Sequence, residues 1–526
     1  MINKLLSEWK GIVIFAPVLL FVAAAIRLIN LTILPVFADE AIYIRWSQVM
    51  ANEPTLRFLP LSDGKQPLFM WILMFLVERF SDPLFIGRLV SVFAGVATIV
   101  GIFCLTFYLF KNKYISLLAS VFWMFSPYAF FFDRMALVDS LLASFGIWTA
   151  FFAVVTAKTK RLDMALLTGF ALGFASLTKS PAIFFALLVP TSWLLAEWRL
   201  NRKDFVVQGG KLVALIVVTY TLALGMYNIQ RLGPNFHMLT SRTYDYVFPV
   251  SHAWTNPKDP LFAHFDRAIE WLRLMGPWPI LVLAAIGFVV NFKKYWKQVV
   301  FLFAWWFVPT IIQAELAKVF TARYELFTIP FIFVLAASAF LTKNKLFKQA
   351  CSVFFILWFI LSVRFDYLLL TDPHKAPLPR SERSGYLEEW TSGIGIKEVA
   401  DYIKNEHSKN PNEKIVIGTE GYFGTLPDGL QIYLQNVPNV TVIGVGLGFG
   451  EVPKPLLDSV KTGTKTYFVA NSSRINDKFE SSLELNGLKI IKTFKKGDRP
   501  LEGYKETVQF GPYDTFYFLE VLPTSN

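Results

Sequence analysis

Charged and polar residues interrupt this sequence at the ends of long apolar stretches, where their side chains can do chemistry. Two adjacent carboxylates, Asp39 and Glu40, lie in FADEAIYIRW, directly after the first apolar stretch. A third carboxylate, Asp139, lies a few residues into a later apolar stretch, and ionisable residues in such places are usually functional. Cationic and phenolic side chains have a similar placement at Lys65, Arg134, Lys179, Arg323 and Tyr324.

Carboxylates and cations on one face suit the transfer of a group from a phosphate-linked donor. The cations, Lys65 and Lys179 foremost, would hold the phosphate and stabilise it as the leaving group. A carboxylate such as Asp39 would take the proton from the incoming hydroxyl. Structural roles stay open for some of these residues. Asp133 and Arg134 can neutralise each other, and lysines at helix ends commonly extend to the membrane interface.

The composition indicates that membrane-spanning segments position these residues. The 526-residue chain is 54% hydrophobic and 16% aromatic, with a mean hydropathy of +0.45, which is too apolar for a soluble globular protein. About eleven apolar runs approach the roughly 20 residues with which a helix crosses a bilayer. They are residues 11–31, 84–110, 115–132, 137–157, 164–178, 181–198, 212–231, 278–292, 299–314, 326–341 and 347–370.

The positive charges predict the orientation of these spans. Every second short connection is basic, beginning with Lys4 and Lys10 before the first run and Lys111 and Lys113 after the second. Cytoplasmic loops carry such an excess, so we expect a cytoplasmic N-terminus and, after an odd number of crossings, an external C-terminus. The net charge of +12 therefore indicates membrane topology rather than nucleic-acid binding. The first run could instead be a signal peptide, which would leave Asp39 on the same outer side.

The character of the sequence changes after Leu370. Residues 371–393 mix prolines with charges and are typical of a linker. Residues 394–526 combine a helical pattern with strand-like runs such as KIVIGTE and DTFYFLEV, which predicts an α/β domain. This segment has no cysteine, which favours a prokaryotic source. We expect a polytopic α-helical membrane domain over residues 1–370 and an independently folding extracytoplasmic α/β domain over residues 394–526.

Two further patterns are weak. The stretch GVGLGFG at 444–450 lacks the glycine spacing of the dinucleotide fingerprint and is followed by prolines, so it predicts a loop. Three histidines, His237, His252 and His264, lie in one long connection between apolar runs. Their spacing is not that of a metal site, which favours ordinary polar roles.

Four short motifs together resemble a known family. FADEAIYIRWSQ, GKQPLFMW, RMALVDS and LTKSP occur in this order, each at the predicted outer end of an apolar run. In combination they resemble the GT-C glycosyltransferases that use polyprenyl-phosphate-linked sugars. The nearest branch is that of the protein O-mannosyltransferases and the aminoarabinose (lipid A) transferases. The resemblance covers residues 11–370 and implies a GT-C-like membrane fold of about eleven helices.

The resemblance also implies roles for the matching residues. Asp39 matches the aspartate implicated in catalysis, and Glu40 and Asp139 are the other carboxylates expected at the site. Contacts to the donor phosphate are implied for Lys65 and Lys179, and they are extended to Arg134, Arg323 and Tyr324.

The sequence departs from the family pattern near Lys65. Gln66 and Pro67 follow this lysine where the family has two prolines. Gly64 stands where lipid A transferases carry an acidic residue that helps to bind zinc. We therefore carry over no metal and expect no cofactor, although a divalent metal stays open.

The expected function is an inverting transfer of a monosaccharide from a polyprenyl-phosphate carrier to a hydroxyl of an outer-face protein, glycan or lipid. The expected partners are this lipid-linked donor, the external acceptor and membrane lipids, with no nucleic acid. The main alternative is a multi-span transporter or flippase, although the paired repeats and broken helices common in transporters are not evident. A third interpretation is a non-catalytic membrane anchor that displays the C-terminal domain.

Overall fold

The computed structural model describes residues 16–198, 201–501 and 504–523, and the chain forms two compact units. The first unit contains Met1–Leu31, Thr55–Ile72 and Arg88–Pro379. The second contains Thr32–Pro54, Leu73–Gly87 and Arg380–Asn526. Both units are therefore assembled from separated stretches of the chain.

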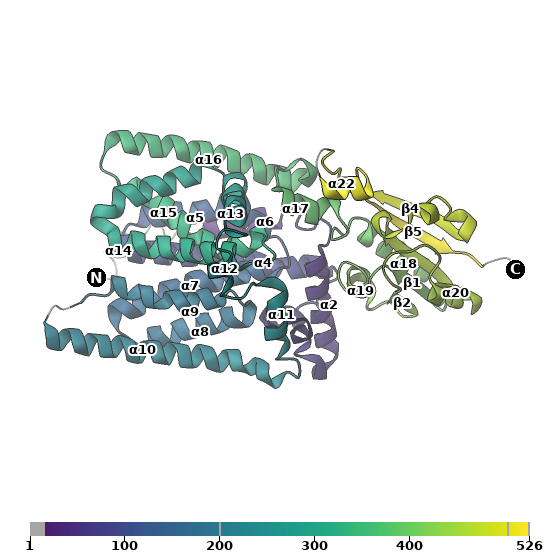
Figure 1. The fold of residues 1–526 in the computed structure, drawn as a ribbon, viewed down its shortest axis with the longest axis horizontal. Helices are drawn as coiled ribbons and strands as arrows, with labels where there is room; N and C mark the ends of the chain where they lie inside the picture. The colour runs from purple at the N-terminus through teal and green to yellow at the C-terminus, as the bar shows by residue number, and fades with distance from the viewer. Residues whose placement is uncertain (1–15, 199–200, 502–503, 524–526) are drawn as a thin grey trace. The chain divides into compact units, whose positions relative to one another are not determined.

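The first unit is built from helices (Figure 1). Its α-helices are Ala16–Leu28, α3 (Leu68–Met74), most of α4 (Pro83–Phe110), α5 (Lys113–Phe125), α6 (Pro127–Phe132), α7 (Val138–Thr159), α8 (Leu162–Thr178), α9 (Ala182–Leu188), α10 (Arg202–Asn228), α11 (Met238–Tyr246), α12 (His252–Thr255), α13 (Leu261–Met275), α14 (Pro279–Leu316), α15 (Ile329–Ser338) and α16 (Lys345–Thr371). This unit also contains the 3-10 helices η2 (Leu59–Asp63), η3 (Val189–Leu195) and η5 (Ala322–Thr328).

Several of these helices suit a lipid bilayer. Within the described residues, six are long and apolar enough to cross it: Pro83–Phe110, Val138–Thr159, Lys203–Leu232, Pro279–Leu316, Ala322–Leu341 and Lys345–Thr371. Shorter apolar helices cover the other predicted runs. Lys4, Lys10 and the start of the first run, residues 11–15, lie outside the described residues. A multi-pass helical membrane protein is thus confirmed, whereas eleven crossings stay a prediction.

The predicted runs 278–292 and 299–314 both lie in α14, but the chain folds back within this element. Tyr295 has a non-helical backbone, with φ −124° and ψ 33°. The rings of Phe288 and Phe303 have centroids 5.4 Å apart. Their separation along one straight helix would be about 22 Å, at 1.5 Å per residue. Helix α14 is therefore two segments that pack against each other across a reversal at Tyr295.

Small residues let α8 and α10 pack closely. A Cβ added to Gly169 would lie 2.9 Å from the Thr219 carbonyl oxygen, and one added to Gly173 would lie 2.4 Å from Met226 Sδ. The Thr219 hydroxyl donates to the Ala165 carbonyl at 3.0 Å. Two small residues one turn apart allow such approach, which is typical of paired membrane helices.

The second unit contains a five-stranded sheet in the order β2-β1-β3-β5-β4. Strands β1 (Ile415–Thr419), β2 (Val440–Gly444) and β3 (Lys465–Asn471) are parallel, and β5 (Thr515–Val521) runs antiparallel to β3 and to β4 (Leu488–Lys495). Its helices are α2 (Ala38–Asn52), α17 (Arg380–Arg383), α18 (Ile396–Lys409), α19 (Asp428–Leu434), α20 (Lys454–Lys461), α21 (Asp477–Glu480) and α22 (Lys505–Phe510). Gly444 ends β2, and the rest of the glycine-rich stretch, residues 445–450, forms a loop, as predicted. The α/β character of the C-terminal segment is confirmed.

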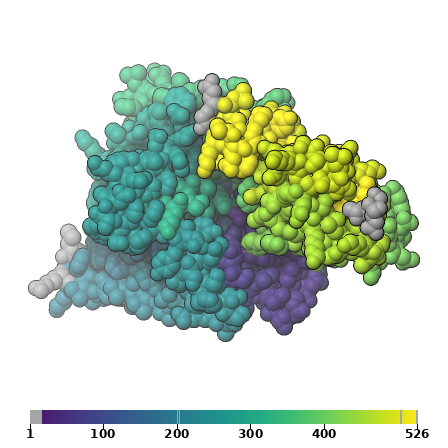
Figure 2. Space-filling model, turned by 45° about the vertical axis from the view of Figure 1, so that its right-hand side comes forward, coloured from purple at the N-terminus to yellow at the C-terminus, as the bar shows by residue number. Residues whose placement is uncertain are grey.

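Helix α2 packs on the C-terminal part of the second unit, although it lies more than 300 residues earlier in the sequence. Arg45 Nη1 donates to Gln435 Oε1 at 2.7 Å, and Gln48 Nε2 donates to the Ile432 carbonyl at 2.9 Å. The rings of Trp46 and Phe423 are stacked with centroids 5.7 Å apart. In the space-filling view, purple residues of the early chain contact the green C-terminal residues (Figure 2). The independent folding of residues 394–526 stays a prediction. Expressed alone, this segment would lack its contacts with α2.

We expect Asp428 to make the stability of the second unit depend on pH. Burial raises the pKa of this carboxyl to about 6, although Gly424 N–H, 2.7 Å away, and the charge of Arg45 oppose the shift. A carboxyl with a raised folded-state pKa stabilises the fold most below about pH 4. That contribution is lost as the pH rises through the folded-state pKa of about 6.

Asp428→Asn keeps an acceptor for the Gly424 N–H but cannot titrate. Relative to the parent, its free energy of unfolding should rise by up to about 3 kcal/mol between about pH 4 and pH 6. Urea unfolding of the full-length protein in detergent, followed by fluorescence at several pH values, measures this difference. Parallel pH profiles for the two proteins would contradict the expectation.

The orientation predicted from the basic connections can be checked directly. A reporter that is active only outside the cytoplasm should be active when fused after Leu370 and silent when fused at Arg202. The physical reason is that lysine-rich and arginine-rich connections are retained in the cytoplasm. The opposite pair of results would mean that the charged ends of the helices face the cytoplasm. A lipid-linked donor would then not be required.

Candidate active site

The first unit brings together two residues that lie 40 positions apart, Asp139 and Lys179. Asp139 belongs to the first turn of α7, and Lys179 caps the C-terminus of α8. Lys179 Nζ donates to Asp139 Oδ1 at 2.6 Å. The Asp139 side chain is only 2% exposed, whereas that of Lys179 is 19% exposed, so the ammonium is the accessible member of the pair. Asp139 therefore orients Lys179.

A tyrosine ring from η5 completes the surroundings of Lys179. Lys179 Nζ lies 4.1 Å from the centroid of the Tyr324 ring. The guanidinium carbon of Arg323 lies 5.4 Å from the same centroid. An ammonium or guanidinium over an aromatic face is attracted by the ring's quadrupole. The structure thus gathers four of the predicted residues, Asp139, Lys179, Arg323 and Tyr324, into one cluster with two cations and one carboxylate.

Glu325 fixes the element that carries Tyr324. Its carboxylate is buried and accepts hydrogen bonds from the Thr310 hydroxyl at 2.5 Å and the Gln313 amide at 2.9 Å, both on α14. The Tyr128 hydroxyl donates to the Ala322 carbonyl at 2.7 Å at the start of η5. Glu325 was not among the residues predicted from the sequence. Its position directly after Tyr324 was the available signal.

The GKQP motif is joined to the LTKSP motif through side chains. Gln66, which is buried, donates from Nε2 to Ser180 Oγ at 2.7 Å. Lys65 directly precedes Gln66, and Lys179 directly precedes Ser180. This hydrogen bond therefore links the two segments that carry the lysines. Sequence reasoning missed this connection, because nothing local relates positions 114 residues apart.

A tight turn sets the backbone at Lys65. Gly64 has a φ of +66°, and a Cβ there would lie 2.6 Å from Arg242 Cβ. Asp63 accepts from Arg242 Nη2 at 2.9 Å, and Lys65 Nζ lies 3.7 Å from the other oxygen of the same carboxylate. The left-handed backbone and the close approach of Arg242 both require glycine at position 64. This is a physical reason for the departure from the family pattern noted above.

Arg134 lies in a different environment. Its guanidinium donates to the backbone carbonyls of Arg27, Ile29 and Asn30 at 3.1, 2.7 and 2.8 Å. These carbonyls belong to the end of the helix Ala16–Leu28 and the residues after it, so Arg134 acts as a C-terminal cap. Asp133, for which mutual neutralisation with Arg134 was an open alternative, accepts from Arg27 Nε at 3.0 Å. Donation to phosphate by Arg134 stays a prediction, and its contacts in the structure indicate anchoring.

Asp39 and Glu40 lie in the second unit, in the first turn of α2. Glu40 is fully buried, and its Oε2 accepts from the Phe37 backbone N–H at 3.0 Å. This contact is the return half of a capping box, so Glu40 defines where α2 begins. Asp39 is partly exposed, and the positive end of the helix dipole favours a carboxylate at this position.

Two of the three histidines of the long connection make separate side-chain contacts. His252 Nδ1 lies 3.4 Å from Glu315 Oε1, and His264 Nδ1 lies 3.1 Å from the Ala314 carbonyl oxygen. Among the residues that the structure describes, no group of three or more His, Cys, Asp and Glu side chains is arranged to hold a metal ion.

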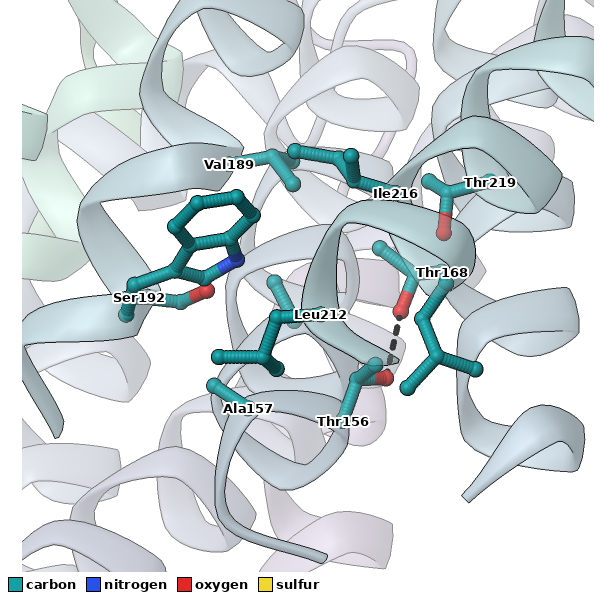
Figure 3. A pocket seen from close by; sticks show the side chains of 11 residues that line it. Thr156, Ala157, Thr168, Val189, Ser192, Leu212, Ile216 and Thr219 are labelled. Carbon is teal, nitrogen blue, oxygen red and sulfur yellow. Dashed lines mark hydrogen bonds between the residues drawn. The ribbon is translucent and has the colours of Figure 1, made fainter. Parts of the chain in front are cut away.

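A small cavity lies elsewhere in the first unit, among α7, α8, η3 and α10 (Figure 3). The hydroxyls of Thr156 and Thr168 are 3.2 Å apart at its wall, and Ser192 and Thr219 also line it. Its volume of about 10 Å³ is room for a single water molecule. None of the lining residues is charged, so this cavity does not compete with the Lys179 cluster as a phosphate site.

Comparison with known proteins gives a family match for one segment and a fold for the chain. Residues 64–223 match the family described as dolichyl-phosphate-mannose-protein mannosyltransferase. No curated protein sequence matched the chain. The chain is similar to the crystal structure of ArnT from Cupriavidus metallidurans bound to undecaprenyl phosphate, with 13% identity, a TM-score of 0.60, and coverage of 96% of this chain and 98% of that chain. The apo state of the same protein gives 13% identity, a TM-score of 0.58, and coverage of 97% and 98%.

At this identity the likeness to ArnT shows a shared fold, and the family match covers 160 of the 526 residues. The matched segment contains four of the predicted site residues, Lys65, Arg134, Asp139 and Lys179. The resemblance inferred from the motifs is thereby confirmed. Residues 64–223 thus match the family described as dolichyl-phosphate-mannose-protein mannosyltransferase, and the chain has the fold of ArnT.

Proposed function

We propose that this protein transfers a monosaccharide from a polyprenyl-phosphate carrier to a hydroxyl of an outer-face protein, glycan or lipid. The observation that carries the proposal is the Lys179 cluster, in which a buried carboxylate and an aromatic ring hold an accessible ammonium at the end of a membrane helix. Undecaprenyl phosphate bound to ArnT, a protein of the same fold, supports a lipid phosphate as the carrier.

The cations act on the leaving group. When the bond between the anomeric carbon and the phosphate oxygen breaks, negative charge develops on that oxygen. Lys179 and Lys65 stabilise this charge, with Arg323 and the Tyr324 hydroxyl as further donors. Fixed donors aimed at developing charge are commonly the largest single contribution to catalysis. The ion pair with Asp139 and the Glu325 network hold these groups in place, so that little reorganisation is needed during the reaction.

The carboxylate acts on the acceptor. Asp39 takes the proton as the acceptor oxygen attacks the anomeric carbon from the side opposite the phosphate. This single displacement inverts the configuration at that carbon, and polyprenyl phosphate leaves with the electron pair of the broken bond. Glu40 supports the reaction by fixing the first turn of α2, because its carboxylate is committed to the Phe37 N–H.

The function is tested with purified protein in detergent micelles. The protein is supplied with a panel of radiolabelled polyprenyl-phosphate sugars and with acceptor fractions of the cell envelope. We expect one sugar to appear in an acceptor, with an equal amount of polyprenyl phosphate released. Micelles enclose no compartment, so turnover there cannot be transport. Absence of transfer from every donor, together with gradient-driven movement of lipid or solute in vesicles, would favour the transporter interpretation instead.

A further inference from the structure

The second unit contains a half-open polar cavity that the transfer chemistry does not use. It has a volume of about 380 Å³, which is in the range of ligand sites. One wall is Gln48 of α2, another is the segment 77–83 at the start of α4, and a third is the end of α19 with Lys404 of α18. All of these residues belong to the second unit.

Two cations line this cavity without carboxylate partners. Across the part of the chain that the structure describes, neither Arg79 nor Lys404 forms an ion pair. Glu78 also lines the cavity, and its Oε1 accepts from Asn52 Nδ2 at 2.5 Å. The charged lining is therefore two cations and one carboxylate, and the carboxylate already has a donor. The net charge of the lining is +1, which a singly charged anion such as a phosphodiester would neutralise.

A buried amide points to a missing ligand group. Gln48 is 6% exposed and lines the cavity. Its Nε2 donates to the Ile432 carbonyl, but its Oε1 is buried and accepts no hydrogen bond from any described residue. An unsatisfied buried acceptor is costly, so a hydroxyl or a water that accompanies a ligand would stabilise it.

The cavity is next to the membrane entry of α4. Phe75 and Phe80 are 63% and 45% exposed on the segment that leads into this helix, and Phe80 lines the cavity. Exposed apolar rings next to a membrane-spanning helix suit lipid acyl chains or the interface. Cations and polar groups beside them suit the phosphate and hydroxyls of a headgroup.

We propose that this cavity binds the phosphate-bearing headgroup of an anionic phospholipid. Arg79 and Lys404 contact the phosphate, and Gln48 accepts from a headgroup hydroxyl. Asp39 and Gln48 are nine positions apart on α2, which places them on opposite faces of the helix at about 100° per residue. The bound lipid is therefore an accessory ligand rather than the reacting substrate, and the proposal does not depend on the proposed transfer reaction.

The test measures lipid retained by the full-length protein. Protein in detergent is titrated with short-chain phosphatidylglycerol, phosphatidylcholine or inorganic phosphate, and bound lipid is counted by native mass spectrometry. We expect phosphatidylglycerol to bind at least tenfold more tightly than phosphatidylcholine. Arg79→Gln and Lys404→Gln should each weaken phosphatidylglycerol binding about tenfold or more, because each removes a charge-assisted contact. Gln48→Ala should weaken it less.

Lys461→Gln is the matched control, because this exposed lysine of α20 lies outside the cavity and should leave binding unchanged. Equal binding by the parent and by Arg79→Gln/Lys404→Gln would overturn the proposal. Displacement of the lipid by an equal concentration of inorganic phosphate would also overturn it, because this result would indicate a site for a soluble anion. Asp39→Asn should retain the lipid, so loss of transfer and loss of lipid binding are distinguishable.

Discussion

Replacing Asp39 by asparagine is expected to lower the rate of sugar transfer by about 10²–10⁴-fold, the usual contribution of a general base. Asparagine keeps the shape and a hydrogen-bond acceptor at the start of α2 but cannot take the acceptor's proton. Donor binding should stay near that of the parent, because the proposed phosphate ligands are unchanged. Single-turnover transfer and equilibrium donor binding, measured separately, distinguish the two effects.

Asp163→Asn is a suitable control for this experiment. Asp163 is also in the first turn of a helix, α8, but its side chain is 51% exposed and pairs with Arg161. It should transfer at the parental rate. A parental rate for Asp39→Asn as well would mean that Asp39 is not the base. Asp139 would then be the next candidate, because its Oδ2 accepts no hydrogen bond from a described residue.

Replacing Lys179 by alanine is expected to lower transfer by about 10²–10³-fold, as does removal of one fixed donor from a developing negative charge. Donor binding should weaken in the same variant, because the ammonium contacts the phosphate before and during the reaction. A second effect follows from the ion pair. Lys179→Ala leaves the Asp139 carboxylate buried without its cation, which costs about 3–5 kcal/mol for a buried pair.

Two further variants separate catalysis from stability. Asp139→Asn/Lys179→Ala removes both charges, so it should recover the detergent stability of the parent but not its activity. Lys158→Ala is the matched control, because Lys158 lies 5.0 Å from the Tyr108 ring centroid at the other end of α7. It should leave transfer unchanged. If the double variant transfers at the parental rate, Lys179 has only a structural role.

The sequence by itself determined the elements of this protein. Hydropathy is a local property, and a run of apolar residues long enough for a bilayer has few alternatives to a helix. The predicted runs therefore coincide with helices, including the two segments of α14 that the lysines near Tyr295 separate. The alternation of strands and helices after Ile394 was readable for the same reason, since side-chain period distinguishes the two.

The motifs also indicated which residues could take part in the chemistry. Asp39, Lys65, Asp139 and Lys179 could be selected because charge next to an apolar run is costly and is kept where it has a use. Their positions at predicted outer ends followed from the basic connections on the other side. The family resemblance added roles that no single motif would have carried.

Only the tertiary structure decided which side chains meet. The pairing of Lys179 with Asp139, and of Gln66 with Ser180, depends on how α7, α8 and the GKQP turn are rotated and spaced. Such rotations result from packing over whole helix faces, which no short window of sequence contains. Packing likewise assigned Arg134 to backbone carbonyls and joined α2 to α19, more than 300 residues away in the sequence. The burial of helix faces against elements distant in the sequence therefore fixes which charged side chains lie together in the candidate site.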